Sequence, residues 1–343
     1  MNICCIGNEE HQIWDDFISR HPSATSYHQY SWRKIIENSF GHPCYYLVLW
    51  ADSGLVSGIL PLVHMKSMLF GNSLVSLPFV NYGGLLCDST DAEIALLRET
   101  EALRQSLGSD HVELRHIGSE KEQLPSRKRK VTMILSLNQD ESAQWKGFNA
   151  KLRNQIRKAE KSGLEPIIGH LDLLDGFYDV FVRNMRDLGT PVYSKEFFKN
   201  VLEEFPDSSR IIAVRHKGKV IAAGIAIWFR DTIEIPWASS IADYRNYCPN
   251  NMLYWEAIRF AIGKGFSKFD FGRSTPNEGT YNFKKQWGAE PVQLYWQYLL
   301  AEEKQLPNLN PNNPKFGIAI SVWKRLPVWV TRILGPRIVR SIP

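Results

Sequence analysis

The segment FDFGRSTPNEGTYNFKKQWGAE, at positions 269–290, joins two aromatic-rich stretches through a polar loop. Its first residues, 269–271, predict a short buried strand. The polar loop at 272–279 follows, and a second strand is expected over 280–285. Loops on a rigid scaffold carry most binding chemistry, so this loop predicts groups that face a ligand. The alternative is a connection whose charged side chains only contact water.

The elements around this segment occur twice in the chain, in the same order. The stretch VLWADSGLVSGILPL (48–62) matches AVRHKGKVIAAGIAI (213–227) in its strand–turn–strand pattern, with Gly54 and Gly218 at the turns. After each stretch come a further strand, a helix and a closing strand. The expected helices are 91–107 and 251–264, and the expected closing strands are 111–115 and 268–271.

This duplication predicts two copies of one mixed α/β unit, each a mixed sheet with helices on its faces. The expected domains are 1–145 and 146–303, and a basic helix at 149–162 opens the second one. A basic amphipathic tail is expected at 304–343.

Composition is that of a folded globular protein, with an uneven charge. Of 343 residues, 44% are hydrophobic and 12% aromatic, and the net charge is +5. Positive charge is concentrated at 127–161 and in the tail. The tail has no acid after Glu303, and its cations are Lys304, Lys315, Lys324, Arg325, Arg332, Arg337 and Arg340.

Cysteine and histidine spacing indicates neither a disulfide nor a metal site. The five cysteines form no CxxC motif, and the nine histidines lack metal-ligand spacing. No Ser/His/Asp or Cys/His pattern is present. The first residues reach Glu9 and Glu10 after a very short apolar run, which does not fit a signal peptide. No apolar run reaches the ~18 residues of a membrane-spanning helix, so a cytoplasmic protein with reduced thiols is expected.

The segment 149–161 predicts a basic helix with two arginines on one face. Leu152, Ile156 and Ala159 form its apolar stripe, and Arg153 and Arg157 lie one turn apart. Arginine suits planar phosphate or carboxylate groups, which it binds through two parallel hydrogen bonds. The alternative is a solvated basic face at a domain boundary.

Four stretches together resemble the FemAB family of peptidoglycan-bridge aminoacyltransferases. They are LRNQIRKAEKSGL (152–164), FDFGRSTPNEGTYNFKKQWGAEP (269–291), NYGGLL (81–86) and NYCPNNMLYWEAI (246–258). The chain is most similar to the FemAB-related branch found beside exosortase/PEP-CTERM exopolysaccharide loci. The resemblance implies two tandem GNAT-like acyltransferase domains. It also implies transfer of an acyl or aminoacyl group to an amine on a cell-envelope or exopolysaccharide precursor.

The resemblance assigns roles to residues of the 269–290 segment. The family's lysine, in a tyrosine–x–phenylalanine–lysine segment, falls on Lys284, and its ammonium would stabilise the oxyanion that forms during acyl transfer. Tyr281 belongs to the same segment and is expected to contact substrate. Lys285 is also expected to contact substrate. It is the neighbour that could be confused with Lys284, because adjacent residues on a strand face opposite ways.

Further residues are expected to bind anionic parts of the substrate. The family's basic-helix arginine falls on Arg157, or else on Arg153, and would hold acceptor phosphates. Arg273 in the polar loop is a candidate anion contact from its residue type alone. Asp270 either orients a lysine or acts as a base, or it caps the loop after its strand.

The resemblance leaves the acyl donor open between aminoacyl-tRNA and acyl-CoA, and no bound cofactor is expected. The long helical arm of tRNA-dependent bridge enzymes has no counterpart here. The phosphate loop of simple acetyltransferases is also missing, and RDLGTP at 186–191 is only a partial match. The expected acceptor is a nucleotide- or lipid-linked sugar or peptide precursor.

The stretch IAISVWKRLPVWVTRILGPRIV (318–339) alternates apolar and basic residues, and prolines interrupt it. Such a segment suits the surface of an anionic membrane, which would place the protein on the inner face of the cytoplasmic membrane through residues 318–340. The alternative is that its apolar side chains pack on the protein's own sheet.

Two other classes of function compete with the enzyme. The first is a nucleic-acid-binding module that uses the basic block at 127–161. Its total charge is low and no reader motif is present, so no stable nucleic-acid complex is expected. The second is a non-catalytic membrane-peripheral scaffold of a polysaccharide assembly system.

Overall fold

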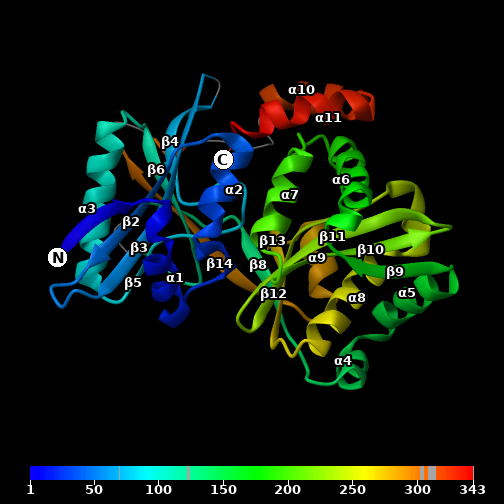
Figure 1. Cartoon of the computed structure of the whole chain (residues 1–343). Helices are drawn as coiled ribbons and strands as arrows, with labels where there is room; N and C mark the ends of the chain where they lie inside the picture. Colours follow the sequence, from blue (N-terminus) through cyan, green and yellow to red (C-terminus); the bar gives the residue numbers. More distant parts are fainter. Residues whose placement is uncertain (69, 122–123, 302–304, 308–313, 343) are drawn as a thin grey trace. The chain divides into compact units, whose positions relative to one another are not determined.

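The computed structural model describes residues 1–343 except 69, 122–123, 302–304, 308–313 and 343 (Figure 1). Lys304 of the predicted basic tail lies outside the described residues. The chain forms two compact units. Unit 1 comprises Met1–Lys130, Gln293–Asn308 and Arg340–Pro343, and unit 2 comprises Val131–Val292 and Leu309–Val339.

Unit 2 is built on a mixed sheet in the order β9-β10-β11-β12-β13-β8. Neighbouring strands are antiparallel except β12 and β13, which are parallel. Figure 1 shows α6 and α7 on one face and α5 and α8 on the other. The strands are β8 Val131–Ser136, β9 Leu164–Gly169, β10 Ser209–His216, β11 Lys219–Phe229, β12 Thr232–Ser240 and β13 Lys268–Ser274. The helices are α4 Glu141–Gly147, α5 Ala150–Lys161, α6 Leu174–Leu188, α7 Lys195–Glu204, α8 Pro249–Gly263, α9 Gly279–Lys285, α10 Pro314–Arg325 and α11 Val328–Val339.

Unit 1 repeats this topology in the order β1-β2-β3-β4-β6-β14. Here β4 and β6 are the parallel pair, and the other neighbours are antiparallel. The predicted duplication of a mixed α/β unit is therefore confirmed. The strands are β1 Asn2–Ile6, β2 Cys44–Trp50, β3 Val56–Ser67, β4 Gly71–Val75, β5 Leu86–Cys87, β6 His111–Ile117, β7 Ser126–Arg127 and β14 Glu290–Leu300, and the helices are α1 His11–Arg20, α2 Ser31–Phe40 and α3 Thr90–Ser106.

The two units divide the chain differently from the domains expected at 1–145 and 146–303. Each unit contains one strand that lies in the other expected range. Strand β8 precedes the second copy but belongs to unit 2, because it pairs with β13. Most of β14 belongs to unit 1, because residues 294–300 pair with β6. A hydrogen bond of 2.9 Å from Tyr298 Oη to the buried Glu113 carboxylate fixes this pairing. Helices α10 and α11 of the expected tail belong to unit 2.

The prediction of a strand over 280–285 is wrong, because these residues form helix α9. Hydrogen bonds between backbone groups four residues apart close it, from Asn282 N to Glu278 O and from Gln286 N to Asn282 O. A helix places Phe283 and Trp287 on one face. Their rings lie 5.4 Å and 6.3 Å from that of Tyr254 on α8. Aromatic packing against α8 therefore decides the conformation of this stretch.

The core of unit 2 forms under the candidate site. Trp287, directly after α9, is 1% exposed and contacts Phe148 edge-on, with ring centroids 5.3 Å apart. Phe271 of β13 and Leu152 of α5 belong to the same cluster. Asn149 caps α5, since its side chain accepts a hydrogen bond from Leu152 N. The helix that carries Arg153 and Arg157 and the segment that carries Lys284 thus share one core.

We expect Trp287→Ala to lower the free energy of unfolding of unit 2 by about 3–5 kcal/mol, because it leaves a cavity among aromatic rings. Chemical denaturation followed by circular dichroism would measure the loss. Trp329→Ala is the matched control, since Trp329 is 66% exposed and its loss should change stability by less than about 0.5 kcal/mol. Equal effects of the two changes would contradict the packing described here.

Candidate functional site

The candidate site lies where β12 and β13 stop pairing. These parallel strands pair at three positions, and the last pair joins Glu234 to Asp270. Directly beyond it, β12 shifts register against β11 before Trp237. Strand β13 likewise shifts register against β8 before Arg273. Such bulges end pairing and redirect side chains. Two buried acidic side chains therefore mark the place where the strands part.

Asp270 is fully buried and holds the bulge that follows it. Its Oδ1 accepts hydrogen bonds from Thr132 Oγ1 at 2.5 Å and from the backbone N–H of Gly272 at 2.7 Å. Gly272 has a φ of +74°, which glycine adopts without the strain that a side chain would cause. Asp270 is thus the residue that caps the loop, and it also places a carboxylate next to Lys284.

Lys284, in the last turn of α9, brings a buried ammonium to the same place. Its Nζ donates to the carbonyl oxygens of Gly272 at 2.8 Å and Arg273 at 2.9 Å, and the residue is only 7% exposed. Burial lowers the pKa of Lys284 to about 8, although attraction by the Asp270 and Glu234 carboxylates opposes this shift. The group therefore changes charge close to neutral pH.

Sequence reasoning missed two buried polar residues of these strands. Glu234 interrupts the apolar run of β12, and a lone acid in a buried strand is a signal that could have identified it. Ser274 ends β13, one residue after the Arg273 carbonyl that Lys284 contacts. Its buried Oγ has no hydrogen-bond partner within the described part of the chain, which marks a place for a ligand or a water.

The other residues proposed from the 269–290 segment are more exposed. Tyr281 is half-buried against the core of unit 2, and the Lys285 Nζ lies 6.0 Å from the centroid of its ring. Lys285 and Arg273 are exposed. The two adjacent lysines face different ways, as expected, but they do so because they lie on a helix and not on a strand. Of the two lysines, Lys284 is the one that binds the carbonyl oxygens at the end of β13.

Helix α5 brings Arg153 nearer to α9 than Arg157. The side chain of Asn149, which caps α5, donates to the carbonyl oxygen of Gln286 directly after α9, at 3.2 Å. Arg153 follows one turn later, with its N–H bonded to Asn149 O, and it is half-buried. Arg157 lies a further turn away, exposed, with its guanidinium 5.5 Å from the centroid of the Trp145 ring. Arg153 is therefore the better placed of the two for a shared ligand.

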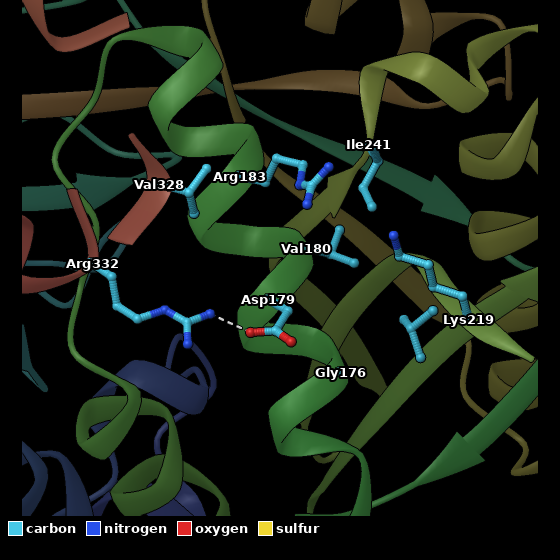
Figure 2. Close-up of a pocket in the computed structure, with 9 residues that line it drawn as sticks. Gly176, Asp179, Val180, Arg183, Lys219, Ile241, Val328 and Arg332 are labelled. Carbon is cyan, nitrogen blue, oxygen red and sulfur yellow. Dashed lines mark hydrogen bonds and ion pairs between the residues drawn. The ribbon is translucent and has the colours of Figure 1, made fainter. Parts of the chain in front are cut away.

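A cavity of about 470 Å³ lies elsewhere in unit 2, between α6, the start of β11 and α11 (Figure 2). Its lining includes Arg183, Lys219 and Arg332, and Arg332 forms an ion pair with Asp179. Figure 2 shows these cations approaching from three elements. None of the site residues proposed from 152–164 and 269–291 lines this cavity, whereas Val328 and Arg332 of the predicted basic tail do.

The partial match to a coenzyme A phosphate loop at 186–191 does not have the geometry of one. It forms the end of α6, where Gly189 has a φ of +82° and caps the helix. Arg186 is already engaged, because it pairs with Asp187 and donates to the Leu326 carbonyl at 3.1 Å. The carboxyl end of a helix disfavours an anion, which binds at the amino end.

Comparison with protein families covers the part of the chain that holds this site. Residues 146–285 match the family described as acetyltransferase (GNAT) domain. This stretch contains α5, the diverging strands and Lys284. Unit 2 thus carries a domain of GNAT type. No curated protein matches the chain.

Solved structures of low identity share the fold of the whole chain. FemX aligns with a TM-score of 0.66 and 14% identity over 86% of this chain and 97% of its own. The C-terminal domain of a putative lysylphosphatidylglycerol synthetase from Agrobacterium fabrum aligns with a TM-score of 0.54 and 13% identity. The alignment covers 84% of this chain and 91% of that domain. A tandem GNAT protein from the clavulanic acid biosynthesis pathway aligns with a TM-score of 0.56 and 10% identity. The alignment covers 89% of this chain and 99% of that protein. The predicted tandem GNAT-like fold is confirmed, whereas the exosortase/PEP-CTERM branch stays a prediction.

We expect Asp270→Asn to lower the pKa of Lys284 below its value of about 8, because the change removes a carboxylate that stabilises the ammonium. A pH titration of the Lys284 ¹³Cε signal by NMR would measure it. Asp231→Asn is the control, since Asp231 is exposed and pairs with Lys268 instead. An unchanged titration of Lys284 in Asp270→Asn would show that the two groups are not coupled.

Proposed function

We propose that the chain is an acyltransferase of Fem type, which transfers an aminoacyl group to an amine on a cell-envelope or exopolysaccharide precursor. The observation that carries the proposal is the buried Lys284 ammonium, held by the Gly272 and Arg273 carbonyls inside a GNAT-type domain. Its position at the parting strands is sheltered from water. Electrostatic stabilisation is strongest in such a place.

Acyl transfer to an amine needs two kinds of group, and the site holds both. The amine nitrogen attacks the acyl carbon, the bond from that carbon to the donor oxygen breaks, and the proton that the amine loses ends on the departing oxygen. Two of the three N–H donors of Lys284 bind the carbonyls of Gly272 and Arg273, which leaves one for the developing oxyanion. The buried Glu234 carboxylate is our candidate to receive the amine proton.

The donor that we favour is aminoacyl-tRNA rather than acyl-CoA. The name of one structural relative, lysylphosphatidylglycerol synthetase, denotes a lysyl group carried on a phospholipid. The resemblance to the FemAB family supports the same class of donor. Acyl-CoA has less support, because residues 186–191 end a helix instead of forming a phosphate loop.

The acceptor that we favour carries phosphate, as nucleotide-linked and lipid-linked precursors do. Arg153 is half-buried on α5, one turn from the contact between Asn149 and Gln286. A guanidinium there binds two phosphate oxygens at once. Exposed Arg273 and Lys285 add positive charge around the same helix.

We expect Lys284→Met to lower kcat by about 10²–10³-fold, the usual cost of losing one oxyanion donor. The assay is intact-mass analysis of a uridine-diphosphate-linked muropeptide after incubation with charged tRNA, which reports the mass of one added amino acid. Wild-type activity should also fall as the pH rises through about 8, where the ammonium deprotonates. Lys284→Arg should lack that decline, because a guanidinium stays charged.

Lys285→Met is the matched control for this experiment and should keep most of the activity. Circular dichroism of each variant would establish that the fold is retained. Full turnover by a folded Lys284→Met protein would exclude the catalytic role and favour the non-catalytic scaffold.

We expect Arg153→Ala to raise the KM for the phosphate-bearing acceptor by roughly 10–100-fold, the cost of losing a charge-assisted hydrogen bond. Initial rates at varied acceptor concentration would measure it. Arg157→Ala is the matched control one turn along α5, and it should change KM much less. A larger rise in KM for Arg157→Ala than for Arg153→Ala would instead identify Arg157 as the phosphate ligand.

A further inference from the structure

The helix pair α10–α11 presents an apolar and basic surface to solvent. On α10, Ile318, Val322 and Arg325 are exposed and share one face. On α11, Trp329, Ile333 and Arg337 do the same. On this face each helix carries two exposed apolar side chains followed by an arginine, and α11 exposes Leu334 and Ile338 as well. Apolar side chains that gather on an exposed helix face mark interaction sites.

The opposite faces of both helices are fixed on unit 2. Trp323 of α10 and Thr331, Gly335 and Val339 of α11 are buried. Both helices contact α6, and Figure 1 shows them next to it. A side chain at Gly335 would meet Val192 atoms at 2.8 Å, so the backbone of α11 approaches its neighbour closely. The buried faces of the two helices therefore anchor the exposed apolar side chains on unit 2.

The charge on this surface has one sign. Lys324 is exposed in addition to Arg325 and Arg337, and no acid occurs from position 304 to the end of the chain. A second copy of the same surface would bring like charges together, which costs free energy. An anionic surface would instead neutralise them.

The cationic cavity of Figure 2 adjoins α11. Arg332 belongs both to α11 and to its lining, and Arg183 and Lys219 come from α6 and β11. Neither Arg183 nor Lys219 has an ion-pair partner among the residues that the structure describes. Apolar side chains of Val180 and Val328 complete the lining. The cavity thus offers positive charge and an apolar wall to a phosphate that carries an alkyl chain.

We propose that α10–α11 is a docking surface for an anionic phospholipid membrane, with the adjoining cavity open to a lipid phosphate. The apolar side chains enter the interfacial region of the bilayer, and the cations contact the head groups. The structure supports this for contact with the surface only: no helix in the described ranges is long and apolar enough to cross a membrane. The surface does not depend on the chemistry proposed for Lys284, so binding can be tested without an activity assay.

The test is sedimentation of the full chain with phosphatidylcholine vesicles that contain or lack phosphatidylglycerol, at low and high salt. We expect binding only to the anionic vesicles, and weaker binding at high salt. The double change Arg325→Gln and Arg337→Gln should weaken it about 30-fold, at about 1 kcal/mol for each cation. The change Trp329→Ser with Ile333→Ser should weaken it by at least about tenfold.

Leu55→Ser in unit 1 is the matched control, because Leu55 is 65% exposed and Trp329 66%, and it should leave binding unchanged. The altered side chains are exposed, and unchanged thermal unfolding would establish that each variant is folded. Equal binding to neutral vesicles, or full binding by the α11 variant, would overturn the proposal. So would self-association, measured by light scattering, that is lost in Trp329→Ser with Ile333→Ser, since the surface would then bind a second copy.

Discussion

The contact between the Lys284 ammonium and the carbonyl oxygens of Gly272 and Arg273 joins α9 to the end of β13. A buried cation is costly unless hydrogen bonds and opposite charges compensate it. The two carbonyls and the buried Asp270 and Glu234 supply that compensation. The bulge after Asp270 is what turns both carbonyls toward Nζ, so the irregular strand end and the helix depend on each other.

This arrangement fixes the position of the Lys284 ammonium and brings its pKa close to neutral. The Trp287 ring, packed on Phe148, holds the end of α9 in place. Desolvation favours the neutral amine, while the neighbouring carboxylates favour the ammonium. The result is a pKa of about 8. At neutral pH most molecules carry the charged form of Lys284, but the neutral form is more populated than it is for an exposed lysine. A group poised in this way can respond to charge that develops on a substrate.

The sequence was sufficient for the repeated topology, because strand alternation, turn glycines and helix periodicity are local signals. It was insufficient where contacts between residues distant in sequence decide the local conformation or the role of a side chain. Residues 280–285 alternate like a strand, yet packing of Phe283 and Trp287 on Tyr254 makes them a helix. Lys284 was identified through a family resemblance. Glu234 was missed because its role depends on a neighbour, Asp270, that is adjacent only through the parallel pairing of β12 and β13.

The duplication shows why we assign the chemistry to unit 2. In each unit the parallel strands end at a pair that contains an acid, which is Asp270 in unit 2 and Glu113 in unit 1. In unit 1, Arg115 binds Glu113 at 2.7 Å, Tyr298 Oη donates to it, and the Ser76 hydroxyl accepts the Arg115 N–H at 2.8 Å. Side chains of the unit's own strands therefore fill that position. In unit 2 the buried Lys284 ammonium, which binds the Gly272 and Arg273 carbonyls, lies beside the equivalent acid. We infer that the first copy kept the architecture and that the second carries the reaction.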